Sequence, residues 1–215
     1  MSQALRISEI FYSLQGESRT IGLPTVFIRL TGCPLRCRWC DSAYAFNGGQ
    51  MIELDGILEQ VASYPARLVT VTGGEPLAQP GALALMQRLC DANYQVSIET
   101  SGALDVADID PRVSVVMDLK APGSDESHRN RWENLDALSA KDQIKFVIAD
   151  RADYEWSRLS IDQHRLSDRV GEVLMSPVHG ELEPKALAEW ILADGAPVRM
   201  QLQMHKYLWG EEPGH

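Results

Sequence analysis

The sequence predicts an α/β fold with a mainly parallel sheet, arranged as a partial (β/α)6-type barrel that is open on one side. Short runs rich in β-branched residues alternate with amphipathic helical patterns from about residue 26 onward, which is typical of βα units. Polar and glycine-rich segments follow most of these runs, and parallel α/β folds place their active sites at the carboxyl ends of the strands. The roughly six strands that the pattern supports are too few to close an eight-stranded barrel.

Each expected element rests on its own local pattern. Strands are expected where Val, Ile and Thr cluster between polar or glycine residues: 26–30, 68–72, 95–100, 113–118 and 144–148, with a further one at 173–175 or 198–203. Helices are expected where apolar residues recur every three to four positions: 52–63, 80–93, 152–166 and 184–194. No repeat, linker or low-complexity tract divides the chain, so residues 1–215 are expected to form a single domain.

Composition narrows the possible partners. The 215-residue chain is 45% hydrophobic and 23% charged, which are ordinary values for a globular protein. No apolar run is long enough to cross a bilayer and no signal-peptide pattern is present, so a reducing cytoplasm is the expected compartment. The net charge of −10 would repel nucleic acid, and no basic stripe offsets it. We therefore expect a small-molecule substrate and neither a nucleic-acid nor a membrane partner.

Cys33, Cys37 and Cys40 form a CxxxCxxC pattern directly after the first expected strand. Thiolates are the usual protein ligands of iron-sulfur clusters, and three of them leave one iron of a [4Fe-4S] cluster open to another ligand. Cys90 is expected on the buried face of a helix, as a small hydrophobic residue. The alternative is a structural zinc site of three cysteines and a histidine, but the chain has no second CxxC hook. A disulfide is less expected, because nothing marks the chain as secreted.

The segment Thr72-Gly73-Gly74-Glu75-Pro76 follows the next expected strand. Glycines at this position let the backbone approach a ligand closely and expose its amides and carbonyls. The alternative is a plain strand-to-helix turn with a proline opening the helix. The segment gains interest because it lies one βα unit after the cysteines.

Several other polar residues are candidates, each with a simpler structural alternative. Ser42 offers a hydroxyl to a hard cation such as Mg²⁺, although Ser and Asp at such a junction often cap helices. Lys120 would neutralise a carboxylate or lie in solvent at a strand end. His205 would donate to a substrate carbonyl or serve as a core histidine.

The N-terminal stretch FYSLQGES also carries polar groups. Gln15 is able to read both a donor and an acceptor on a heterocycle, and Arg29 is able to hold a carboxylate through two hydrogen bonds. Glu99, at the end of the third expected strand, would accept from ring or amino N–H groups. The alternatives are ordinary turn, surface and strand-terminal residues.

Taken together, the motifs resemble a known family. The cysteine motif with Trp39 before its last cysteine, and TGGEP, resemble the radical S-adenosylmethionine (SAM) superfamily. FYSLQGES, GLPTVFIRLTGCPLRCRWCDSAYAF, SIETSG and HKYLW resemble the 7-carboxy-7-deazaguanine synthase (QueE) family, and the likeness is densest over residues 11–46.

The resemblance implies a radical SAM barrel and a lyase of queuosine and 7-deazapurine biosynthesis. Such an enzyme contracts the ring of 6-carboxy-5,6,7,8-tetrahydropterin to give 7-carboxy-7-deazaguanine with loss of ammonia. The implied cofactors are a [4Fe-4S] cluster, SAM and Mg²⁺. The implied partners are an electron donor such as flavodoxin or ferredoxin and a second copy of the chain in a homodimer.

The resemblance also implies roles for individual residues. The implied cluster ligands are Cys33, Cys37 and Cys40, and Ser42 is the implied Mg²⁺ ligand. The implied SAM contacts are Trp39, Cys40, Asp41, Gly74, Asp118, Lys120 and Ser176. The implied pterin contacts are Leu14, Gln15, Gly16, Arg29 and Thr72, with Glu17, Glu99 and His205 as weaker assignments.

Two residues depart from the family pattern, and two other functions stay open. Ser18 stands where the family usually has glycine, and Ser42 stands where it usually has threonine. Some relatives bring the terminal carboxylate, here that of His215, near the substrate. The alternatives are an activating enzyme that installs a glycyl radical on a partner protein, disfavoured by LQGES, Arg29 and HKYLW, and a zinc-stabilised binding module.

Overall fold

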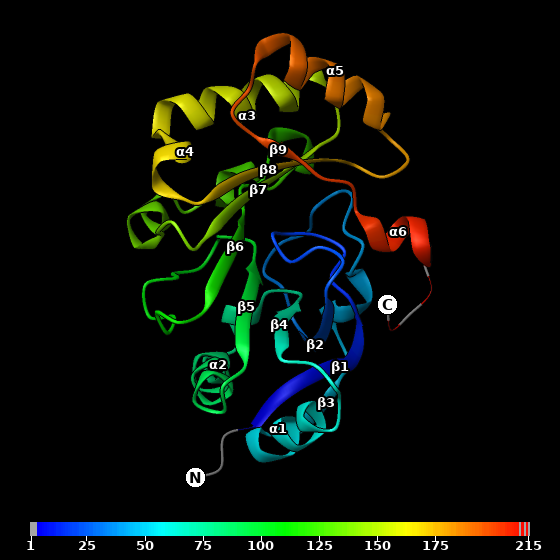
Figure 1. Ribbon diagram of the computed structural model, residues 1–215, viewed down its shortest axis with the longest axis vertical. Helices are drawn as coiled ribbons and strands as arrows, with labels where there is room; N and C mark the ends of the chain where they lie inside the picture. The colour runs from blue at the N-terminus through cyan, green and yellow to red at the C-terminus, as the bar shows by residue number, and fades with distance from the viewer. Residues whose placement is uncertain (1–3, 211, 213, 215) are drawn as a thin grey trace.

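A computed structural model describes residues 4–210, 212 and 214, and its centre is one curved nine-stranded sheet in the order β3-β1-β2-β4-β5-β6-β7-β8-β9 (Figure 1). The parallel part consists of β2 (Pro24–Leu30), β4 (Leu68–Gly73), β5 (Gln95–Thr100), β6 (Ser114–Asp118), β7 (Gln143–Ile148) and β8 (Glu172–Pro177). These strands are rich in Val and Ile, β-branched residues that favour the extended conformation and pack beneath the helices. The predicted partial, mainly parallel barrel is confirmed.

Two antiparallel strands lie at one edge of these six strands, and a short parallel strand lies at the other edge. β1 (Ala4–Leu14) pairs antiparallel with β2, and β3 (Gln50–Glu53) pairs antiparallel with β1. β9 (Arg199–Met200) extends the other edge, parallel to β8. The sequence-based count of roughly six strands was therefore wrong: both candidate late strands form, and the two antiparallel strands were missed.

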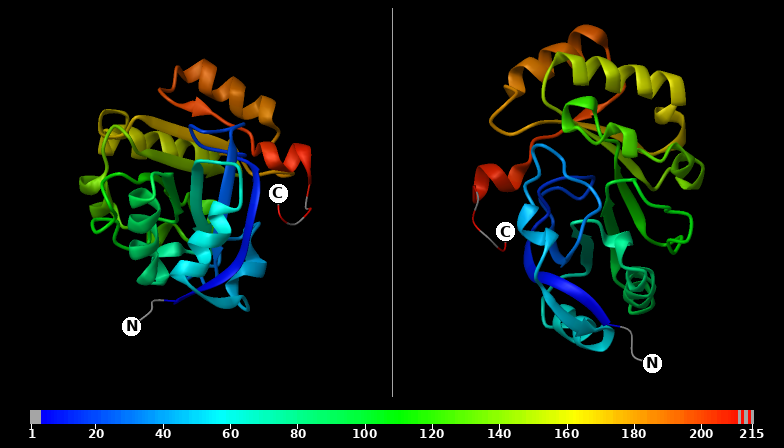
Figure 2. Two further views of the ribbon diagram at one scale, coloured as in Figure 1. Left: turned by 60° about the horizontal axis from the view of Figure 1, so that its bottom comes forward. Right: turned by 180° about the vertical axis from the view of Figure 1, so that it is seen from behind.

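Helices cover the outside of the sheet. Figures 1 and 2 show α1 and α2 at one end of the molecule and α3, α4 and α5 at the other. The helices are α1 (Leu54–Ala62), α2 (Gly81–Asp91), α3 (Arg151–His164), α4 (Leu166–Arg169), α5 (Pro184–Asp194) and α6 (Met204–Leu208). Short 3₁₀ turns lie at Ala43–Phe46, Pro76–Ala78, Pro122–Ser124, Ser127–Arg129 and Trp132–Ala137. Within the described part of the chain, no helix is both long enough and apolar enough to span a membrane.

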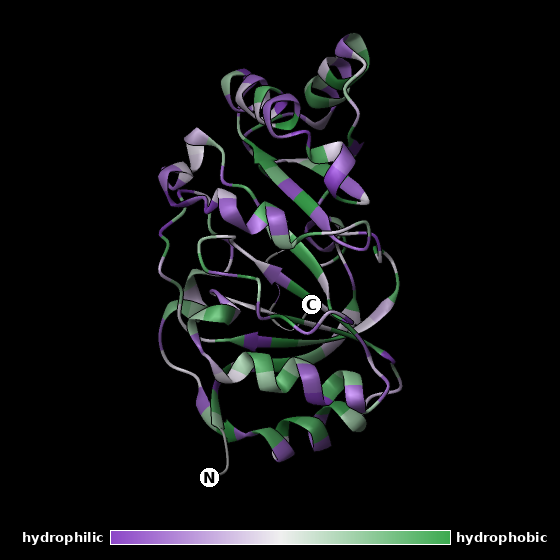
Figure 3. Ribbon diagram, turned by 90° about the vertical axis from the view of Figure 1, so that its left-hand side faces the viewer, coloured by the Kyte–Doolittle hydropathy of each residue, from purple (hydrophilic) through white to green (hydrophobic). Residues whose placement is uncertain are grey.

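The helix boundaries follow from local chemistry. α2 buries Leu85, Met86 and Leu89 at helical spacing against the sheet, and green and purple residues alternate along the helices in Figure 3, as amphipathic packing requires. At the start of α3, the Asp150 carboxylate accepts a hydrogen bond from the backbone N–H of Asp153 at 2.9 Å. The helices thus bury their apolar faces on one side of the sheet and leave its other side for polar residues.

Candidate active site

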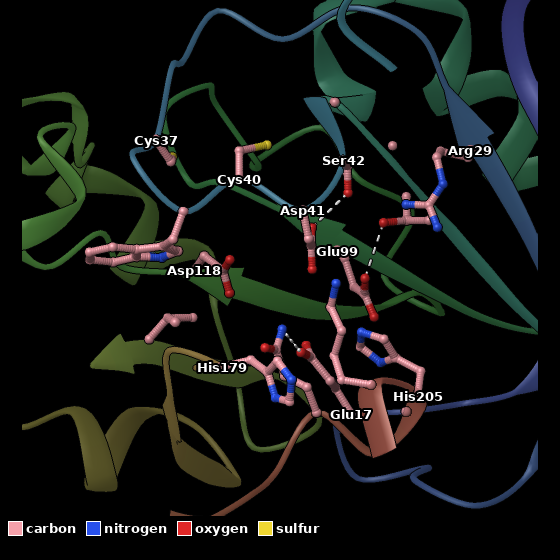
Figure 4. A pocket seen from close by; sticks show the side chains of 18 of the residues that line it. Glu17, Arg29, Cys37, Cys40, Asp41, Ser42, Glu99, Asp118, His179 and His205 are labelled. Atoms are coloured by element: carbon pink, nitrogen blue, oxygen red, sulfur yellow. Dashed lines mark hydrogen bonds between the residues drawn. The ribbon is translucent and has the colours of Figure 1, made fainter. Parts of the chain in front are cut away.

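A cavity of about 680 Å³ lies where the carboxyl ends of the parallel strands meet. Figure 4 shows Cys37, Cys40 and Asp118 toward one side of it, and Arg29, Glu99 and His205 toward the other. Every residue that the sequence analysis assigned to the cluster, SAM, Mg²⁺ or pterin lines the cavity, with the exception of Ser176. The fold therefore gathers assigned residues as distant in the sequence as Leu14 and His205, 191 positions apart, into one space.

The cysteine loop between β2 and Ala43–Phe46 is anchored at both arginines that it contains. The Arg36 guanidinium donates to the carbonyl of Cys33 at 2.8 Å. Arg38 forms two hydrogen bonds with the Glu181 carboxylate, at 2.8 and 3.2 Å, and so ties the loop to the segment after β8. Arg36 thus stabilises the loop internally, and Arg38 links it to the segment after β8.

The three thiols of the cysteine motif share one cavity. Cys33, Cys37 and Cys40 are partly exposed and face the same cavity, and burial raises the pKa of each thiol above its usual value. Among the described residues, no set of three His, Cys, Asp or Glu side chains is arranged around one metal ion. Three thiols facing one cavity are the ligand set that a [4Fe-4S] cluster with one open iron requires.

Cys90 is excluded as a nearby fourth ligand by its position. It is 8% exposed on α2, within the hydrophobic core, and it does not line the cavity. The expectation that it serves as a small buried hydrophobic residue is met. Three cysteines remain for the cavity.

Gly74, directly after β4, has a steric role in addition to the expected one of exposing the backbone to a ligand. A Cβ atom on Gly74 would lie 2.2 Å from the carbonyl oxygen of Gly32 and 2.9 Å from Cβ of Cys33. The Gly74 N–H donates to the Leu30 carbonyl at 3.1 Å, and the next N–H, of Glu75, donates to the Gly32 carbonyl at 2.7 Å. Glycine is required here because two loops of the cavity pack backbone against backbone.

The Glu75 side chain stabilises the position of the TGGEP segment. Its carboxylate is fully buried and accepts hydrogen bonds from the hydroxyl of Thr100 and from the N–H and hydroxyl of Ser101. It also accepts from the backbone N–H of Leu77 at 3.0 Å. A buried carboxylate with this many donors joins the TGGEP segment to the end of β5.

Gln15, Thr72 and Glu99, three residues of the cavity wall, form a hydrogen-bonded group. The Gln15 amide donates to Glu99 Oε1 at 3.3 Å, and the Thr72 hydroxyl donates to Glu99 Oε2 at 3.0 Å. Burial raises the pKa of Glu99, although Lys145 opposes this effect. The group presents both donors and acceptors, as recognition of a heterocycle requires.

Arg29 has a partner that the sequence analysis missed. Its Nε–H donates to Glu9 Oε1 at 2.6 Å, and the Tyr44 hydroxyl donates to the same oxygen at 2.8 Å. Its guanidinium lies 5.6 Å from the centre of the Phe11 ring. Glu9 accepts only the Nε–H, and within the described residues no hydrogen bond engages the two terminal amino groups of Arg29.

The other candidates are placed as follows. The Lys120 ammonium lies 2.8 Å from Asp118 Oδ2, and the Ser42 hydroxyl donates to Asp41 Oδ1 at 2.8 Å. Ser176, near the end of β8, is fully buried, and its hydroxyl has no hydrogen-bond partner in the described part of the chain. Neither Lys120 nor Ser176 is a solvated surface residue.

Ser18 adopts the conformation that glycine prefers. Its φ of +65° lies in the left-handed region. Gln201 holds this peptide from both sides: Ser18 N–H donates to its Oε1 at 2.9 Å, and its Nε2 donates to the Ser18 carbonyl at 2.6 Å. His215 lies outside the described residues.

Comparison with known proteins agrees with this site. A profile described as the Radical SAM superfamily matches residues 27–149, which include the cysteine loop, TGGEP and Asp118-Leu119-Lys120. The fold and the three-cysteine cavity thus define a radical SAM protein.

Two curated relatives narrow the family further. The 7-carboxy-7-deazaguanine synthases of Koribacter versatilis and Chlorobaculum tepidum are each 45% identical to this chain, over 97% of its length and over 98% and 96% of their own. The crystal structure of QueE from Escherichia coli has the same fold, with a TM-score of 0.76 and 24% identity, over 94% of this chain and 95% of that one. The chain belongs to the 7-carboxy-7-deazaguanine synthase family.

Proposed function

We propose that this chain is a 7-carboxy-7-deazaguanine synthase. It would convert 6-carboxy-5,6,7,8-tetrahydropterin to 7-carboxy-7-deazaguanine with loss of ammonia, a lyase reaction of queuosine and 7-deazapurine biosynthesis. The observation that carries the proposal is the meeting of a three-cysteine loop and a heterocycle-reading group, Gln15 with Glu99, in one cavity. The two relatives at 45% identity bear the same name.

The cofactors are assigned to residues of the cavity. We propose that Cys33, Cys37 and Cys40 hold a [4Fe-4S] cluster. The proposed SAM contacts are Trp39, Cys40, Asp41, Gly74, Asp118, Lys120 and Ser176. When bound, the cluster and SAM supply a carbon-centred radical able to abstract hydrogen from an unreactive C–H bond.

The chain's own residues bind and orient the pterin. Gln15 and Glu99 would face its ring nitrogens and amino group, while Arg29 would hold its carboxylate with the terminal amino groups that Glu9 leaves unused. The further proposed contacts are Leu14, Gly16, Glu17, Thr72 and His205. Ser42 would supply a hydroxyl ligand to Mg²⁺ beside that carboxylate, where serine keeps the oxygen that threonine provides in the family.

We infer that the C-terminal segment, which lines part of the cavity, closes over the proposed pterin site. The backbone N–H of Met204 donates to the Gly16 carbonyl at 3.0 Å, so α6 sits directly over the loop after β1. Burial lowers the pKa of His205, which favours its neutral form. This closure would exclude water from the reacting centre.

Partners and compartment follow from the chemistry. A flavodoxin or ferredoxin would deliver the electron, and the chain would act in the cytoplasm, where its thiols stay reduced. We also propose that residues 1–215 act as one domain and that two copies form a homodimer.

The test is turnover without any protein partner. Protein reconstituted anaerobically with iron and sulfide is incubated with SAM, dithionite and the tetrahydropterin, and the products are identified by mass. We expect 7-carboxy-7-deazaguanine and ammonia. SAM cleavage with no pterin product would overturn the proposal in favour of an activating enzyme, and zinc without iron would favour the binding module.

A further inference from the structure

Lys145 is a buried cation at the centre of the cavity that no part of the sequence analysis singled out. It lies on β7, is 7% exposed and lines the cavity. Its ammonium nitrogen is 2.5 Å from Glu17 Oε2 and 3.3 Å from Asp118 Oδ1. Lys145 therefore contacts one residue assigned to the pterin side and one assigned to the SAM side.

These contacts belong to a longer chain of polar groups. On the pterin side, the Gln203 amide donates to Glu17 Oε1 at 2.9 Å. On the SAM side, Asp118 Oδ2 pairs with the Lys120 ammonium at 2.8 Å. The chain of contacts runs without a gap from Gln203 through Glu17, Lys145 and Asp118 to Lys120.

The chain depends on Lys145 because no other cation reaches both carboxylates within ion-pair distance among the described residues. Burial by itself lowers the pKa of Lys145, but Asp118, Glu17 and Glu99 outweigh it and raise that pKa well above the ordinary value. The side chain is thus a cation under working conditions. Among the ion pairs of the described residues, removing it would take away the contact of Glu17 with Lys145 and leave the contact of Asp118 with Lys120.

Asp118 is shared between two ammonium groups, at 2.8 Å from Lys120 and 3.3 Å from Lys145. A ligand that engaged Asp118 or Lys120 would change this sharing, and with it the balance of the Lys145 contacts between Asp118 and Glu17. Glu17 is 7% exposed, and its backbone N–H donates to Gln15 Oε1 at 3.2 Å. A shift of Glu17 would therefore displace a hydrogen-bond donor to Gln15, one of the proposed pterin contacts. Coupling between two sites requires such a shared element.

We propose that Lys145 is a positioning residue that couples the SAM side of the cavity to the pterin side, so that either ligand tightens the binding of the other. This inference rests on the proposed function, because it takes the pterin as the second ligand. Coupling free energies between sites are reciprocal. SAM should therefore raise pterin affinity by the same factor as the pterin raises SAM affinity.

The test measures binding rather than turnover. Cluster-reconstituted protein without reductant is titrated anaerobically with the tetrahydropterin, with and without saturating SAM. We expect SAM to tighten pterin binding about tenfold in the wild type, within the usual range of such coupling, and less than about twofold in Lys145→Met. Lys141→Met is the matched control, since Lys141 pairs with Asp142 outside the cavity, and it should keep the wild-type factor.

A second variant covers a failure of Lys145→Met to fold. Glu17→Gln with Lys145→Met removes one charge of each sign and leaves the Asp118–Lys120 pair intact, and it too should lose the coupling. If the wild type binds and turns over the pterin, two results overturn this inference and leave the proposed function standing. One is the same coupling factor in the wild type and in either variant, and the other is no coupling in the wild type. Failure of the wild type to bind the pterin overturns both this inference and the proposed function.

Discussion

Gly16 and His205 lie so close together that a Cβ atom on Gly16 would stand 2.3 Å from Nδ1 of His205. The two residues are 189 positions apart in the sequence, on the loop after β1 and on α6. The absence of a side chain on Gly16 is what allows α6 to pack against the loop after β1 at the wall of the cavity.

Gly16→Ala should push His205 and α6 away from the cavity. Overpacking of this kind costs about 1–3 kcal/mol. Most of that cost should appear as a higher KM for the pterin, with a smaller change in the melting temperature. Gly56→Ala on α1 is the control, because its Cβ would meet only Ile52 at 3.4 Å. A KM equal to that of the wild type would show that α6 does not shape the pterin site.

Arg29→Ala should weaken pterin binding more than it changes SAM cleavage. A hydrogen bond to a charged group contributes about 1.5–3 kcal/mol, so KM for the pterin should rise at least tenfold. Because the substitution also leaves Glu9 without its 2.6 Å partner, the variant is paired with Glu9→Gln/Arg29→Ala, which removes that carboxylate as well. The measurement is the ratio of 5′-deoxyadenosine to pterin product, which should rise in both variants. An unchanged KM would remove Arg29 from the pterin site.

Ser18→Gly should stabilise the protein. A non-glycine residue in the left-handed region costs roughly 1–2 kcal/mol, and the two hydrogen bonds to Gln201 involve only the backbone of Ser18 and are kept. Loss of the hydroxyl contact to Thr20 at 3.1 Å offsets part of the gain. We expect a melting temperature higher by about 2–4 °C. Ser18→Ala keeps the strain, loses the hydroxyl and should not be stabilised; equal melting temperatures for all three proteins would contradict this account.

Glu99 should make stability depend on pH. Burial raises the pKa of Glu99 above its ordinary value of 4.5, so the folded protein binds this proton more tightly than the unfolded chain. The stability that this protonation contributes is complete below pH 4.5 and is lost as the pH rises through the raised pKa. Urea denaturation of the wild type and Glu99→Gln across this range should show a growing relative gain for the variant. Parallel stability curves would show that the pKa of Glu99 is not raised.

The sequence predicted the parallel core well because each strand and helix there has a strong local pattern. β5 and α5 begin and end at the expected residues, 95–100 and 184–194. β1 was missed because a register shift between Ile7 and Glu9 breaks the alternation that marks a strand. β3 was missed because the strand has only four residues, most of which are exposed.

The candidate site was predictable where motifs carry it and not where only tertiary contacts do. The cysteine loop and TGGEP are recognisable from the spacing of their residues. Glu9 is a single charged residue in a strand, and its pairing with Arg29 depends on β1 lying beside β2. The sequence indicates Lys145 in one way only, as a single cation in the otherwise apolar run IKFVI. That pattern is also compatible with a surface-facing strand position, so the contacts with Glu17 and Asp118 were needed to recognise its role.

The central claim is that three cysteines hold a cluster and leave one iron open to SAM. It is tested most directly by metal analysis and electron paramagnetic resonance of the anaerobically purified, dithionite-reduced protein, with and without SAM. We predict about four irons and four sulfides per chain, a spectrum that changes when SAM is added, loss of the cluster in Cys37→Ala and retention of it in Cys90→Ala. One zinc without sulfide, or a cluster spectrum that SAM leaves unchanged, would contradict the account.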